Sequence, residues 1–123
     1  MRARALVATL GLLGAAGAGI LAGAPTAMAA PAGCPSGATC AYTGTNFTGS
    51  VGPIYGNNSN LTVYSTFRNV ESVYNNGTQC EDFMFYGENL TGSSFGIPIG
   101  YQNQNLGGSW AWHHIDSNQW CNA

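Results

Sequence analysis

The sequence predicts an all-β fold, a disulfide-stapled sandwich of two Greek-key motifs. First, residues 42–50 (YTGTNFTGS) and residues 85–93 (FYGENLTGS) share Gly, Asn and a Thr-Gly-Ser ending at an offset of 43. Second, no sustained helical stripe of apolar side chains follows residue 30. Third, the four cysteines lie in a chain whose N-terminus carries an export signal. A repeat of this period is typical of one supersecondary unit used twice.

The first element is a predicted secretory signal peptide over residues 1–29. Arg2 and Arg4 give it a positive start, residues 6–24 are mostly apolar, and Ala27-Met28-Ala29 has the small residues of a cleavage site. A retained membrane anchor is the alternative, but no second apolar span follows. We therefore expect a secreted, extracellular single domain over residues 30–123, without membrane contact once the signal is removed.

Short β-rich runs fill the remaining chain, and each is bounded by Gly, Asn, Pro or Ser. They predict strands at residues 38–43, 50–55, 61–66, 70–75, 79–86, 94–99 and 109–115. Asn76-Gly77, between two of these runs, is a strong signal for a type I′ hairpin. Four short strands make a Greek key, so we expect one copy at about 38–78 and a second at about 79–123, packed as a sandwich.

The repeated residues are predicted to shape the two hairpins. A glycine adopts positive φ readily, and an aromatic ring can fold over a tight turn. Each copy also has a later serine, which we expect to hydrogen-bond to the backbone of its hairpin. These fold-motif residues are Tyr42, Phe47, Gly49 and Ser72 in the first copy, and Phe85, Leu90, Gly92 and Ser117 in the second.

The cysteines predict two disulfides, for which the sequence allows three pairings. Pro35 and Gly37 make a tight turn that favours the pair Cys34–Cys40 and leaves Cys80–Cys121. The alternative is a zinc site, which export and the lack of paired Cys-x-x-Cys spacings disfavour.

Charge and motifs exclude several function classes. Beyond the signal peptide Arg68 is the only basic residue, against five acidic ones, which argues against nucleic acid and anionic membranes as partners. Gly92-Ser93-Ser94-Phe95-Gly96 matches the nucleophile elbow, but the elbow needs a large α/β sheet. His113 and His114 would point to opposite faces of a strand and could not share a metal ion. We expect no enzyme activity and no metal or other cofactor.

Trp110 and Trp112 alternate within the last predicted strand and would share one face of it. Core packing is one interpretation of this pair. An exposed aromatic platform for glycans or protein surfaces is the other.

The hairpin pattern, the later serine and the duplication resemble the βγ-crystallin Greek-key motif. Residues 34–45 (CPSGATCAYTGT) resemble, more narrowly, the secreted actinobacterial proteins of peptidase inhibitor family I36, whose type member inhibits thermolysin-like metalloproteinases. The resemblance implies a βγ-crystallin-like fold and an extracellular protease as partner. Calcium-binding βγ-crystallins need two Asn or Asp residues where this chain has Phe67-Arg68 and Trp112-His113, so neither copy resembles a calcium site.

We therefore predict a monomeric, secreted peptidase inhibitor that inserts a substrate-like loop into the cleft of its target. The expected target is a metalloproteinase. The candidate loops are Ile54-Tyr55 and Ile97-Pro98-Ile99. The second is favoured because thermolysin-like enzymes prefer apolar side chains and the flanking Gly96 and Gly100 let it protrude. The same isoleucines also fit buried strand positions.

One feature separates this chain from the characterised inhibitor of the family. The resemblance implies that this inhibitor holds its reactive loop with a second short disulfide. In the present chain, Cys80 has no cysteine close to it in sequence. The alternative function is a non-inhibitory extracellular βγ-crystallin-type structural or antimicrobial protein.

Overall fold

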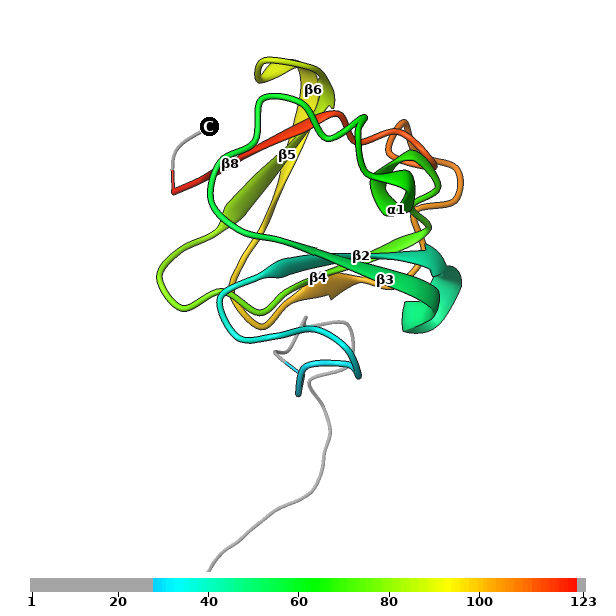
Figure 1. The fold of residues 1–123 in the computed structure, drawn as a ribbon, viewed down its shortest axis with the longest axis vertical. Coiled ribbons are helices and arrows are strands. Elements are labelled where there is room, and N and C mark those ends of the chain that lie inside the picture. The colour runs from blue at the N-terminus through cyan, green and yellow to red at the C-terminus, as the bar shows by residue number, and fades with distance from the viewer. Residues whose placement is uncertain (1–27, 122–123) are drawn as a thin grey trace, which may run out of the picture.

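Two antiparallel sheets face each other in the computed structural model, which describes residues 28–121 (Figure 1). One sheet has the strand order β3-β2-β4-β7 and the other β6-β5-β8. The elements are β2 (Thr39–Gly44), η2 (Thr45–Phe47), β3 (Thr48–Ile54), α1 (Ser65–Arg68), β4 (Ser72–Asn75), β5 (Asp82–Gly87), β6 (Thr91–Ile97), β7 (Gln102–Asn103) and β8 (Ser117–Trp120). The predicted all-β sandwich is confirmed. Nearly all of the predicted signal peptide lies outside the described residues.

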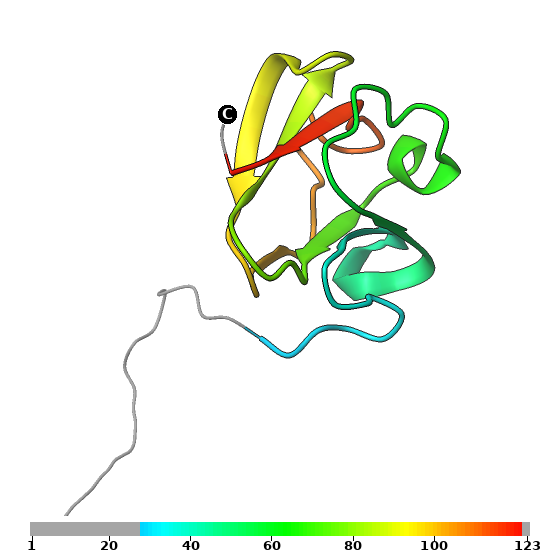
Figure 2. The same ribbon diagram turned by 60° about the vertical axis from the view of Figure 1, so that its left-hand side comes forward.

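Each copy contributes residues that pair with the sheet of the other copy. The strands β2, β3 and β4 come from the first copy, and β7 of the second copy completes their sheet by pairing with β4. In return, Asn58 of the first copy forms a bridge with Asn118 of β8, through two backbone hydrogen bonds of 3.1 and 3.0 Å. The expected four-stranded copies are therefore joined by exchange and are not two self-contained sheets (Figure 2).

The predicted serines lock the two hairpins. Ser72 Oγ accepts a hydrogen bond from Phe47 N at 3.0 Å and donates one to Gly44 O at 2.7 Å. Ser117 Oγ accepts from Leu90 N at 2.9 Å and donates to a carbonyl of its own hairpin at 2.6 Å. The serine is needed because both hairpins turn through residues with positive φ, which leaves an amide without a ladder partner.

Replacing the second serine is expected to destabilise the domain. In Ser117→Ala the partly buried amide of Leu90 loses its acceptor beside the fully buried residue 117, which costs about 1–2 kcal/mol of unfolding free energy. Chemical denaturation measures the change. Ser93→Ala, at an exposed position of the same hairpin, is the matched control and should leave stability unchanged. Equal stability of the two variants would show that the serine does not lock the hairpin.

The main core lies between the two sheets, and a smaller one lies outside the first sheet. The main core includes Val73, Met84, Ile97 and Ile115. The smaller one is covered by the segment around Cys34. Both predicted disulfides are confirmed: Cys34–Cys40 lies beside the smaller core, and Cys80–Cys121 joins the start of the second copy to its end.

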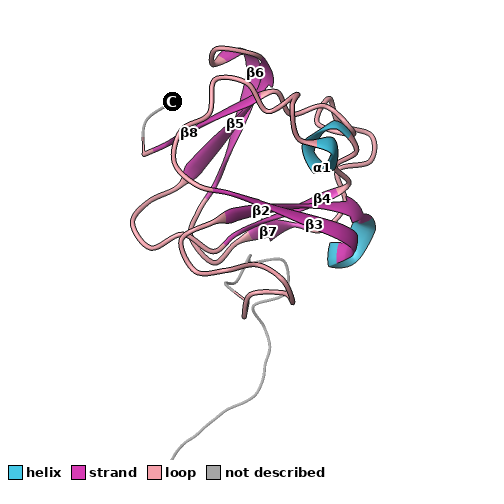
Figure 3. Ribbon diagram, in the orientation of Figure 1, coloured by secondary structure: helices cyan, strands magenta, loops and turns pink. Residues whose placement is uncertain are grey.

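Two of the predicted strands are wrong. Residues 61–66 form a turn and the start of α1 (Figure 3). Leu61 anchors this turn, because its side chain is buried and its N–H donates to Asp116 O at 2.7 Å. Residues 109–115 form successive turns, and His113 has a φ of 58°, which a strand does not allow.

The predicted hairpin at Asn76-Gly77 is also wrong. β4 pairs with β2 and β7, whereas β5 pairs with β6 and β8, so residues 76–81 cross from one sheet to the other. Two hydrogen bonds direct this crossing: Gly77 N donates to Asn75 Oδ1 at 2.7 Å, and Gly37 N donates to Asn76 O at 2.8 Å. Asn-Gly here marks a change of sheet.

Candidate functional site

The favoured contact loop, residues 97–99, is a short turn at the end of β6. Ile97 is a core residue, with 3 % of its surface exposed, so its assignment as a protease contact is corrected. It is buried because it lies opposite Asp82 of β5, on the face of the sheet that meets the other sheet. Pro98 and Ile99 are exposed, Ile99 by 37 %. These two residues form the accessible part of the loop.

Hydrogen bonds hold this turn to Asn75, the last residue of β4. The Asn75 side-chain Nδ2 donates to Ile97 O at 2.6 Å, and the backbone carbonyl of Asn75 accepts from Gly100 N at 2.8 Å. Tyr101 N donates to Pro98 O at 3.0 Å, which closes a β-turn with Gly100 at a φ of 77°. The loop is thus fixed before any partner arrives, although it is a tight turn and not the extended segment that the substrate-like mechanism requires.

An apolar groove of about 440 Å³ lies beside the turn. It runs between β6 and β7, which belong to different sheets. The residues that line it are Phe95, Gly96, Ile97, Pro98, Tyr101, Gln102 and Asn103. The groove and the exposed Pro98–Ile99 pair therefore form one continuous surface where the chain of the second copy crosses from β6 to β7, that is, from one sheet to the other.

The other candidate loop occupies the equivalent crossing of the first copy. Ile54 is buried, whereas Tyr55 is 57 % exposed. A further exposed turn was missed because its residues were predicted to be a strand: Val63, at the tip of the turn from Leu61 to Tyr64, is 72 % exposed. A signal for it exists in the sequence, since an Asn side chain commonly accepts a hydrogen bond from the backbone N–H two residues later in an Asx turn, and Thr62 N donates to Asn60 Oδ1.

A second pocket, of about 370 Å³, lies at the Cys80–Cys121 disulfide. The exposed Thr78 and Gln79 and the ring of Trp120 line part of it. Trp120 is held in place because its indole N–H donates to Gly56 O at 2.9 Å. The long disulfide therefore fixes one end of the segment between the two copies.

A buried carboxyl group lies in the core beneath the turn. Asp82 is fully buried and accepts hydrogen bonds from Asn118 Nδ2 at 2.8 and 3.1 Å. Burial raises the pKa of Asp82 to about 6, although the side chains of Thr39 and Asn118 partly oppose the rise. Asn118 makes both of the hydrogen bonds to this carboxylate described above, whereas Thr39 Oγ1 makes no hydrogen bond of good geometry within the described residues.

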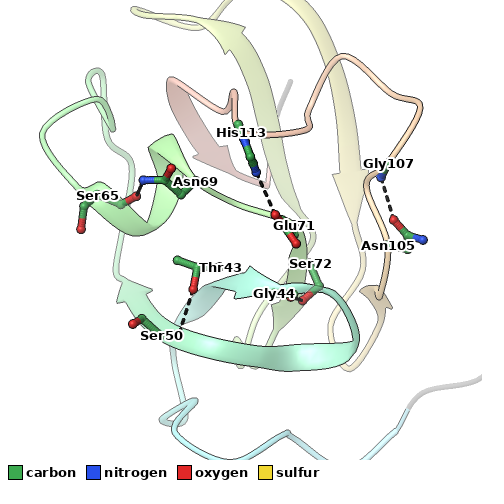
Figure 4. A network of polar contacts seen from close by, with 10 residues as sticks. All are labelled: Thr43, Gly44, Ser50, Ser65, Asn69, Glu71, Ser72, Asn105, Gly107 and His113. Atoms are coloured by element: carbon green, nitrogen blue, oxygen red, sulfur yellow. Dashed lines mark hydrogen bonds and ion pairs between the residues drawn. The ribbon is translucent and has the colours of Figure 1, made fainter.

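The two histidines each face a carboxylate. His113 Nε2 lies 2.9 Å from Glu71 Oε2, and His114 Nε2 lies 3.3 Å from Asp116 Oδ2 (Figure 4 shows the first pair). Residues 28–121 contain no group of three or more His, Cys, Asp or Glu side chains that could hold a metal ion. The pairs link polar side chains at the surface, since all four are partly exposed.

The two tryptophans do not share a face, because their segment is not a strand. Trp110 packs against Phe95 and Tyr86, with ring centroids 5.4 and 6.0 Å away. Trp112 stacks on His113, with centroids 4.7 Å apart. Tyr86 also stacks on a histidine ring, so much of its surface is already in contact within the domain. Trp110 therefore packs against the core, whereas Trp112 lies at the surface.

Ser94 lies within β6 and not at a strand-to-helix turn. The segment that matches the nucleophile elbow therefore has a different backbone from the elbow. No helix within residues 28–121 is long and apolar enough to cross a membrane.

Comparisons with known proteins agree with this architecture. The model of peptidase inhibitor family I36 matches residues 27–97, which is more than half of the chain. The curated proteins contain no significant match.

Several solved structures are similar in fold. One, from work on the evolution of the eye lens βγ-crystallin domain fold, has 23 % identity, covers 73 % of this chain and 91 % of its own, and has a TM-score of 0.63. A βγ-crystallin from Ciona intestinalis has 20 % identity, coverage of 68 % and 99 %, and a TM-score of 0.56. IPSE/alpha-1 from Schistosoma mansoni eggs has 20 % identity, coverage of 72 % and 88 %, and a TM-score of 0.57. The fold is that of a βγ-crystallin domain.

Proposed function

Because this chain belongs to peptidase inhibitor family I36, we propose that it is a secreted inhibitor of a metalloproteinase and that Pro98 and Ile99 contact the protease cleft. The family match is the observation that carries the inhibitory role. The two disulfides are consistent with an extracellular protein. No acid–base pair enters the proposal, which concerns binding alone.

The fixed geometry of the turn supports it as the contact site. A rigid loop loses little conformational entropy when it binds, so more of the contact energy remains as affinity. The hydrogen bonds to Asn75 and the closed turn supply this rigidity. Ile99 offers an exposed apolar side chain of the kind that thermolysin-like enzymes favour, and the adjacent groove can receive a side chain of the protease.

The inhibitory role is tested with the protein recovered from the culture medium of a secreting host. It is titrated against thermolysin and against a serine protease at a fixed substrate concentration. We expect inhibition of thermolysin and little effect on the serine protease. Absence of inhibition of both enzymes at micromolar concentrations would contradict the inhibitor proposal.

Replacing the exposed isoleucine tests the contact site. Ile99→Asp places a charge where an apolar contact is expected, so the inhibition constant against thermolysin should rise at least about tenfold, which corresponds to about 1.4 kcal/mol. Val63→Asp is the matched control, because Val63 is an exposed apolar residue in a tight turn of the first copy. It should inhibit as the natural sequence does. Loss of inhibition in Val63→Asp alone would place the contact on the turn at residues 61–64.

A further inference from the structure

The outer strands of the two sheets differ in how they are protected from pairing with another chain. β3 contains Pro53, and Thr66 of α1 packs so closely against Gly52 that no side chain would fit there. β8 is covered by the bridge from Asn58. β7 has only two residues. β6 is the exception, because it has seven residues and contains neither proline nor a charged side chain.

The hydrogen bonds of β5 show which backbone groups of β6 point outward. Glu81, which precedes β5, accepts a hydrogen bond at its carbonyl from Cys121 N, and Phe85 O accepts one from Asp116 N. Every second residue from Glu81 to Phe85 therefore directs its backbone N–H and C=O groups toward β8. The intervening residues of β5 therefore direct theirs toward β6. In β6, Ser94 lies opposite Phe85 and Gly96 lies two residues further on. Both turn their N–H and C=O groups away from β5.

The two copies differ at this edge. Gly96 corresponds to Pro53 at the repeat offset of 43, and the two occupy the same register positions, opposite Phe83 and Cys40. Proline has no N–H, so the first copy lacks the donor that would point outward at this position. The second copy retains it. Among the turn, loop and inter-element backbone hydrogen bonds of residues 28–121, none involves the N–H or C=O of Ser94 or Gly96.

We propose that β6 is a docking strand, which an extended segment at the rim of the target protease's cleft joins as an added strand. An edge with free N–H and C=O groups two residues apart fits an extended polypeptide backbone. β6 leads directly into Pro98 and Ile99, and the apolar groove borders its last residues. Pairing along Ser94 and Gly96 would therefore align the turn with the cleft. This inference rests on the proposed inhibitory function.

Two variants at one position separate backbone pairing from side-chain contact. Ser94→Pro removes the outward N–H and leaves the ladder with β5 intact, whereas Ser94→Ala keeps the N–H and removes only the hydroxyl. Inhibition constants against thermolysin are measured for both, with circular dichroism and melting curves to confirm the fold. We expect at least about tenfold weaker inhibition for Ser94→Pro, and a change within about twofold for Ser94→Ala.

A second variant keeps the test usable if Ser94→Pro does not fold. Gly96→Pro reproduces the residue of the first copy at the equivalent position. The atoms nearest to the Cβ that it adds are side-chain atoms of Glu81 and Phe83, which must move aside to admit it, so the fold of this variant is confirmed in the same way. It should weaken inhibition to the same extent as Ser94→Pro.

The outcomes distinguish this inference from the proposed function. If the natural sequence does not inhibit thermolysin, both are overturned. If it inhibits and a folded proline variant inhibits equally well, the docking strand is overturned and the inhibitory function stands. Analytical ultracentrifugation adds one further outcome: a dimer that the proline variant converts to a monomer, with an unchanged inhibition constant, would assign the edge to a second copy of this chain and overturn the docking strand.

Discussion

Removing the Cys80–Cys121 disulfide is expected to lower the free energy of unfolding by about 4 kcal/mol. The bond closes a loop between residues 41 positions apart, so it strongly restricts the unfolded chain. A domain of this size has a total stability of about 5–15 kcal/mol, which makes the loss a large part of the whole. The double variant Cys80→Ser/Cys121→Ser, compared with the natural sequence by equilibrium chemical denaturation, measures it.

The other disulfide is the matched control. Cys34–Cys40 spans only 6 positions, so the corresponding double serine variant should lose about 2 kcal/mol. The two losses should therefore differ by roughly a factor of two if loop closure is the main effect. Equal losses would mean that local packing around the cysteines matters more than the length of the loop.

The second large effect is a fall in stability as the pH rises through 6. Asp82 has a pKa of about 6 in the folded protein, above the ordinary 3.8, so the folded state binds its proton more tightly than the unfolded state does. Its contribution to stability is complete below pH 3.8 and is lost as the pH rises through about 6. The separation of the two pKa values corresponds to about 3 kcal/mol.

This dependence is measured by denaturant titrations at a series of pH values from 4 to 8. Asp82→Asn cannot ionise and still offers an oxygen to Asn118, so its profile should lack the fall. Glu88→Gln, which changes an exposed carboxylate, should keep it. A fall of the same size in Asp82→Asn would assign the effect to groups other than Asp82.

The repeated hairpins could be predicted because their residues have one local role in both copies. Ser72 and Ser117 follow their hairpins at similar distances, and each caps the same kind of turn. The segment at residues 61–66 could not be predicted in this way. Val63 and Tyr64 have high strand propensity, but the buried anchor Leu61 bonds to the other copy and overrides it.

The candidate site was predictable only in part. Ile97, Pro98 and Ile99 are apolar neighbours in the sequence, and nothing in their spacing shows that the first is buried beneath the sheet. The crossing between sheets decides this, and it depends on Asn75, which lies more than twenty residues earlier and bonds to Ile97 O. The open edge of β6 likewise becomes visible only when its register is compared with that of β3.

The exchange of strands between the copies has a consequence for folding. The first copy leaves the ribosome first, but its sheet is completed by β7, which is made near the end of the chain. The second copy depends in turn on Asn58, which covers the edge of β8. Neither half can bury its core alone, so folding should be a single cooperative transition that awaits synthesis of nearly the whole chain.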